Sequence, residues 1–94
     1  MDELIKYDDE KNYIRAILDY TKAIHVKNYN GETFFTAKKK NTLRQVKARI
    51  YLEEGINPND QHLFFNGEEL TDEHTALSEL GITDGSTITL VRFT

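Results

Sequence analysis

The 94-residue sequence predicts an α+β fold in which one helix crosses a mixed β-sheet, with a helical extension at the N-terminus. Three observations predict it: an alternating strand that meets an Asn-Gly turn at residues 30–31, a capped helix that begins after Thr42, and an alternating β-branched run at residues 86–91. This length supports one small domain. We therefore expect a helical extension over residues 1–22 and a globular domain over residues 23–94.

Residues 9–20 have the pattern of an amphipathic helix. Asp8 or Asp9 can cap its start. A lone helix of about twelve residues is marginal in water, so its apolar side is expected to pack against another surface. This docking stripe consists of Tyr13, Ile14, Ile17, Leu18 and Tyr20.

A β-hairpin is expected next. Residues 23–27 alternate apolar and polar side chains, residues 29–31 (Tyr-Asn-Gly) supply the turn, and residues 33–36 return. Asn-Gly fits either a two-residue turn or a three-residue loop with Gly31 left-handed. The choice decides which pair of side chains faces the core, and the sequence leaves both registers open. The two pairs are Phe34 with Thr36 and Phe35 with Ala37.

A second helix begins after Thr42, which forms a capping box with Gln45. Gly55 offers a left-handed cap at its C-terminus. The apolar stripe of this helix is Leu43, Val46 and Ile50.

The rest of the chain predicts short strands and turns. A strand at residues 62–65 leads through Asn66-Gly67 into a short continuation at residues 68–70. Residues 75–80 form a helical turn that ends at Gly81. The last strand spans residues 86–91, and its inward-facing side chains are Ile88 and Leu90.

Composition excludes several classes of protein. The chain has no cysteine, so it has no disulfide framework, thiolate zinc site or thiol nucleophile. No apolar run approaches the roughly 18–20 residues that span a bilayer, and the N-terminus does not resemble a signal peptide. We expect a protein of the cytoplasm, the nucleus or both, with no membrane partner.

The net charge of −4 is unevenly distributed: residues 23–50 carry 7 basic and 1 acidic side chains, and residues 51–94 carry 1 basic and 9 acidic. The run Lys38-Lys39-Lys40 has no interleaved aromatic residues on which bases would stack. We therefore expect a solvated basic patch near residues 38–49, beside acidic loops at residues 68–73, and no nucleic-acid partner.

No catalytic, cofactor or metal site is expected. Catalysis needs a nucleophile or an acid–base pair held in a pocket, and Ser78 and Ser86 lie in turn and helix-cap contexts. The three histidines, His25, His62 and His74, lack the helical spacing of paired metal ligands, and no glycine-rich phosphate loop occurs.

Two spacings carry family information: Gly55-Ile56-x-Pro58 and Leu63-Phe64-Phe65-x-Gly67. With Ile24-His25-Val26-Lys27 before them and residues 86–91 after them, they resemble ubiquitin and the ubiquitin-like domains over residues 23–92. The resemblance implies a β-grasp fold. It also implies a module that other proteins bind, rather than an enzyme.

The resemblance further implies a receptor-binding patch on the exposed face of the sheet. Alternation agrees with it, because Phe64 points outward if Leu63 and Phe65 point inward. An apolar patch with an aromatic centre is typical of a protein-binding hot spot. The matching positions are Tyr29, Phe64, Thr89 and Val91, with His62 and Phe93 at the edge.

The expected function is that of a non-conjugated ubiquitin-like interaction module, read by helices of ubiquitin-system or proteasomal receptors. The sequence ends Val91-Arg92-Phe93-Thr94 without the di-glycine through which ubiquitin is conjugated, so conjugation would require a natural chain that continues past Thr94. Ubiquitin chains are linked through lysines, and only two of the matching positions in this sequence are lysines, Lys27 and Lys47. We expect a monomer.

The alternative is a structural assembly domain of a larger complex, which would use the N-terminal helix and the sheet face. The helix at residues 9–20 packs within its own chain, on the sheet patch or on the side of the second helix at Ala48 and Leu52, or it packs on another chain in a helix-mediated dimer, or it stays frayed. The sequence leaves these open.

Overall fold

The structure is a computed structural model that describes residues 21–91. The expected helix at residues 9–20, with its docking stripe, and the patch residue Phe93 lie outside the described residues. The described elements are β1 (Ile24–Asn28), β2 (Thr33–Ala37), α2 (Leu43–Glu54), η1 (Pro58–Asp60), β3 (His62–Phe65), β4 (Glu68–Glu69), η2 (Leu77–Leu80) and β5 (Thr87–Val91).

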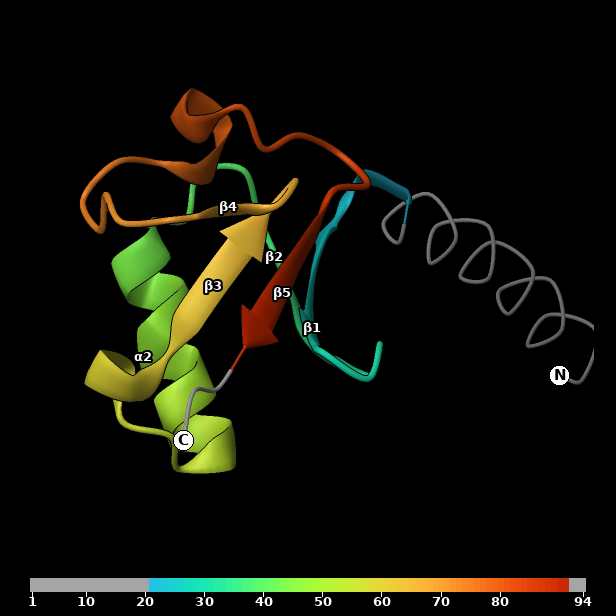
Figure 1. The fold of residues 1–94 in the computed structure, drawn as a ribbon. Helices are drawn as coiled ribbons and strands as arrows, with labels where there is room; N and C mark the ends of the chain where they lie inside the picture. Colours follow the sequence, from blue (N-terminus) through green and yellow to red (C-terminus); the bar gives the residue numbers. More distant parts are fainter. Residues whose placement is uncertain (1–20, 92–94) are drawn as a thin grey trace, which may run out of the picture.

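The strands form one mixed sheet of five strands in the order β2-β1-β5-β3-β4. β1 and β5 run parallel at the centre, and the other neighbouring strands are antiparallel. Figure 1 shows α2 packed across one side of this sheet. The α+β fold with one helix crossing a mixed sheet is therefore confirmed.

The hairpin of β1 and β2 adopts the second of the two registers that the sequence leaves open. Gly31 has a φ of 87°, and the Asn28 amide donates to the Glu32 carbonyl at 2.9 Å, which closes a three-residue loop. Val26 pairs with Phe35 and Ile24 with Ala37. Both β2 partners are buried, so Phe35 and Ala37 face the core.

Both ends of α2 have the predicted caps. The Thr42 hydroxyl accepts from the Gln45 amide at 3.2 Å, and the Gln45 side chain accepts from the Thr42 amide at 2.9 Å. At the other end Gly55 has a φ of 72°, and its amide donates to the Tyr51 carbonyl. Because these caps satisfy groups that the helix itself cannot, α2 begins and ends where the local sequence predicts.

The core lies between α2 and the inner face of the sheet. Ile88 and Leu90 point into it from β5, as predicted. Leu77 enters from η2, a 3₁₀ helical turn that ends at Gly81 as expected and begins two residues later than expected. The other buried apolar side chains are Ile24, Val26, Phe35, Ala37, Leu43, Val46, Ile50, Leu63 and Ile82. Within residues 21–91, no helix is long and apolar enough to cross a membrane.

Candidate protein-binding surface

The outer face of the sheet carries the predicted patch residues in two rows. In one row Phe64 on β3 pairs with Thr89 on β5, and Thr89 pairs in turn with Lys27 on β1. In the next row His62 pairs with Val91. Since neighbouring strands lie about 4.8 Å apart, the residues within each row are direct neighbours on one surface.

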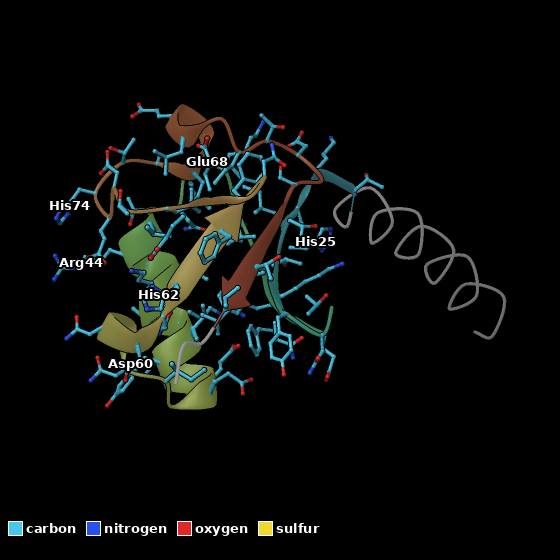
Figure 2. All side chains as sticks on the ribbon, in the orientation of Figure 1. His25, Arg44, Asp60, His62, Glu68 and His74 are labelled. Carbon is cyan, nitrogen blue, oxygen red and sulfur yellow. The ribbon has the colours of Figure 1, made fainter. Side chains whose placement is uncertain are left out.

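The burial of the intervening residues fixes which way these side chains point. Leu63 on β3 and Leu90 on β5 are buried in the core, so the residues on either side of each must face the opposite side of the sheet. Phe64 and Val91 are accordingly only partly buried. Figure 2 shows His25 and His62 on opposite sides of β5, which agrees with the strand order.

Tyr29 lies in the turn directly after β1. Asn28, the last residue of β1, pairs with Leu90 on β5. The Tyr29 side chain is 74% exposed. The strand pairings therefore bring together four of the six predicted patch residues, His62, Phe64, Thr89 and Val91, while Tyr29 lies in the turn after β1 and Phe93 lies outside the described residues.

Charged side chains flank the patch with opposite signs. On the β4 side Glu69 pairs with Phe64 across the strands, and its carboxylate lies 2.8 Å from the Nδ1 atom of His62. On the β1 side Lys27 stands beside Thr89. A partner that covers the patch would therefore meet an acidic border along β4 and a basic one along β1.

Acidic side chains pair with part of the basic segment. The Lys47 ammonium is 3.0 Å from the Glu73 carboxylate, and the Lys47 side chain is only 12% exposed. Arg49 and Glu53 are 3.1 Å apart along α2, and Lys39 lies 3.4 Å from Asp84. These pairs reduce the positive charge that a nucleic-acid backbone would require.

The acidic loop before η2 is a structural turn. The Thr75 hydroxyl donates to the Asp72 carboxylate at 2.6 Å and the His74 amide donates at 3.2 Å. These hydrogen bonds, led by that from Thr75, hold the pKa of Asp72 below its ordinary value. Across residues 21–91, no group of three or more histidine and acidic side chains is arranged to hold a metal ion.

Two features escape the sequence interpretation, and a third, on α2, extends the surface expected at Leu52 to Tyr51. Gln61 is buried at 1% exposure and donates to two backbone carbonyls. Tyr51 and Leu52 are exposed apolar residues on α2, at 51% and 81%. A hollow lies between β2 and α2, with Phe35 and Val46 in its lining. The hollow could have been predicted only from the register of the hairpin, which the sequence leaves open.

Comparisons with known proteins agree with this architecture. Residues 24–93 match the family model described as the Ubiquitin family. A Dictyostelium discoideum protein named Ubiquitin-like protein NEDD8-like protein 2 is 48% identical over 46 residues, which are 49% of this chain and 56% of that protein. A Neurospora crassa protein named DNA damage-inducible protein 1 is 37% identical over 49 residues, which are 52% of this chain and 11% of that protein. The matched part is thus about half of the first relative and about a tenth of the second.

Proposed function

The chain belongs to the ubiquitin family, and from this premise we propose that it is a non-covalent recognition module whose outer sheet face is bound by helices of ubiquitin-system or proteasomal receptors. One observation supports this proposal above the others: Phe64 and Val91 lie in adjacent rows of the same exposed surface. Its role is to bind other proteins rather than to catalyse a reaction.

A helix fits this surface in size and chemistry. Two rows of the sheet are narrower than the roughly 10 Å diameter of a helix, so one helix covers both rows. Its apolar side would bury Phe64 and Val91, and completing the burial of one such side chain contributes up to about 2 kcal/mol. The border formed by Glu69 favours a basic side chain on the helix at that edge.

The test is a titration of the ¹⁵N-labelled chain with a synthetic receptor helix of a ubiquitin-binding protein, followed by NMR. We expect chemical-shift changes centred on Phe64, Thr89 and Val91. Phe64→Ala should weaken binding about tenfold or more, because it removes the aromatic centre of the patch. The matched control is Leu52→Ala, which truncates an exposed apolar residue on α2 and should leave the affinity unchanged.

Two results would contradict the proposal. One is an equal loss of affinity for Phe64→Ala and Leu52→Ala, since a specific patch requires a difference between them. The other is a set of shift changes that avoids β3 and β5 altogether. Thermal unfolding of both variants checks that each still folds.

A second candidate function is that of an assembly domain in a larger complex. The observation in its favour is the exposed pair Tyr51 and Leu52 on α2, because large apolar side chains at adjacent exposed positions are typical of contact surfaces. Sedimentation velocity distinguishes the two functions. Self-association that Leu52→Ala abolishes favours assembly, and a monomer at all concentrations favours receptor recognition.

A further inference from the structure

A side-chain contact between His62 and Glu69 lies at the border of the proposed patch. The Nδ1 atom of His62 is 2.8 Å from the Oε2 atom of Glu69. His62 pairs with Val91, whereas Glu69 pairs with Phe64. The two residues therefore belong to adjacent rows and are diagonal neighbours on the outer face of the sheet.

Both side chains remain within reach of a bound partner. The His62 side chain is 31% exposed and that of Glu69 is 39% exposed. Charges with this exposure are partly screened by water, so each changes an affinity by a few-fold rather than by orders of magnitude. A receptor helix that covers Phe64 and Val91 lies directly beside the contact, because each of its residues is the strand partner of one patch residue.

The contact can keep its geometry when the imidazole gains a proton. A carboxylate only accepts hydrogen bonds, so neutral His62 must carry its hydrogen on Nδ1 and donate it to Glu69. The imidazolium carries hydrogens on both ring nitrogens and donates from Nδ1 in the same way. The net charge of the pair alone changes, from one negative charge to none, because the imidazolium cancels the carboxylate.

The other charged groups on the elements beside His62 are acids and an arginine. Glu68 precedes Glu69 on β4, and Asp60 is the last residue of η1, two positions before His62. β5 itself carries no charged side chain, and Arg92, which follows it in the sequence, lies outside the described residues. Carboxylic acids and arginine ordinarily titrate outside the range of about pH 5–8 in which histidine does. A change of charge at this border within that range therefore comes from the imidazole.

The two other histidines of the chain lie elsewhere. His25 is on β1, which β5 separates from β3, and it is buried at 6% exposure. His74 is exposed in the loop before η2. Since both are histidines, an experiment on the border must distinguish their titration from that of His62.

We infer that the His62–Glu69 pair determines which charge a receptor helix must carry at this edge of the patch, and that this preference changes with pH; the inference rests on the proposed function. When His62 is neutral, the charge of Glu69 favours a helix with a basic side chain at the edge. As the pH falls and His62 gains a proton, that preference is lost. A helix with an acidic side chain at the same edge gains affinity instead, because it meets the imidazolium.

The test uses two synthetic amphipathic helices with the same apolar stripe, one with lysines on both flanks of the stripe and the other with glutamates. NMR titration of the ¹⁵N-labelled whole chain measures the affinity for each at about pH 5.5 and about pH 8, and the ring nitrogens of His62 report its protonation. The lysine helix should bind about threefold more weakly at the lower pH, and the glutamate helix about threefold more tightly, as expected for one exposed charge.

Three variants assign the effect to this pair. His62→Gln has no titratable group and should remove both responses to pH, whereas the matched control His74→Gln should keep both. Glu69→Gln removes the carboxylate, so the lysine helix should bind it about threefold more weakly at the higher pH. Thermal unfolding at both pH values checks that each variant folds. A purely structural contact would change the Tm of His62→Gln without making the two helices respond to pH in opposite directions.

Four results would overturn the inference. Responses of both helices in the same direction would show that pH acts on the patch as a whole. Opposite responses that persist in His62→Gln would assign the titration to another group, such as His25. Equal affinities at both pH values, in a chain whose binding Phe64→Ala still weakens, would refute this inference and leave the proposed function standing. Absence of binding by either helix at either pH would refute both.

Discussion

The buried side chain of Gln61 offers a direct test of how the loop after α2 is held in place. Its Nε2 atom donates to the backbone carbonyls of Lys47 and Ile56, each at 2.9 Å. One carbonyl belongs to α2 and the other to the segment that follows it, so a single amide joins both to the start of β3. Gln61→Met keeps the length and approximate volume of the side chain while removing both donors.

The expected cost follows from the two hydrogen bonds. Each intramolecular hydrogen bond contributes about 1 kcal/mol net, so losing two lowers the free energy of unfolding by about 2 kcal/mol. The loss is not offset by water, because the side chain is 1% exposed. For a domain of this size, 1 kcal/mol corresponds to a change in Tm of roughly 4–8 °C. We therefore expect Gln61→Met to lower Tm by roughly 8–16 °C.

Urea unfolding followed by circular dichroism measures the expected loss of unfolding free energy, and thermal unfolding measures the change in Tm. The slope of the unfolding free energy against urea should stay constant, since the native and unfolded surfaces are almost unchanged. Leu63→Met is the matched control: it places a methionine at a neighbouring buried position without removing any hydrogen bond. If Gln61→Met costs no more than Leu63→Met, the two hydrogen bonds do not hold the loop and the reasoning fails.

Two further predictions concern local hydrogen bonds. Thr42→Ala removes the hydroxyl that accepts from the Gln45 amide, so it should lower the unfolding free energy by about 1 kcal/mol in urea, whereas Thr42→Ser should retain most of it. Thr75→Val removes the main hydrogen bond that lowers the pKa of Asp72, so the Asp72 titration followed by ¹³C NMR should move upward toward its ordinary value. The lowered pKa of Asp72 in the folded protein stabilises it at pH values above the pKa of the unfolded chain. This stabilisation is lost as the pH falls through the folded-state pKa. The difference in unfolding free energy between the wild type and Thr75→Val should therefore narrow in acid. An Asp72 titration that is identical in the two proteins would contradict the assignment.

The parts of the fold that the sequence predicts correctly are those governed by local interactions. The capping box of Thr42 and Gln45 spans four residues, and the cap at Gly55 requires a single left-handed residue. Each satisfies backbone groups of α2 within one turn of the chain. Such features need no knowledge of the rest of the molecule, and so both ends of α2 follow from sequence.

The register of β2 is not local in this sense. Phe34 and Phe35 are adjacent aromatic residues, so a hydrophobic pattern favours neither as the inward one. The register also shifts between Val26 and Lys27, which changes how β2 matches β1 partway along the hairpin. The three-residue loop at Gly31 and the packing against α2 together determine that Phe35 faces inward. The hollow beside β2 depends on that choice, which is why it could not be predicted.

The patch on the sheet could be predicted from the sequence only in part. Alternation within β3 and β5 predicts that Phe64 and Val91 point outward, but it says nothing of their being neighbours. That relation depends on β5 lying between β1 and β3, a non-local pairing that the family resemblance implied and the strand order now shows. The parallel pairing of β1 with β5 likewise places Asn28 beside Leu90, although 62 positions separate them in the chain.

The strand order also converts the uneven charge of the sequence into a charge gradient across the sheet. The basic residues that follow β2 lie at one edge, and Glu68 and Glu69 of β4 lie at the other. The proposed patch lies between β1 and β4, so a receptor helix would meet this gradient as it approaches. Since surface charges steer an encounter over about 10 Å at moderate salt, the gradient should fix the direction in which the helix binds. The apolar contacts with Phe64 and Val91 are short-range, so added salt should slow association more than it speeds dissociation.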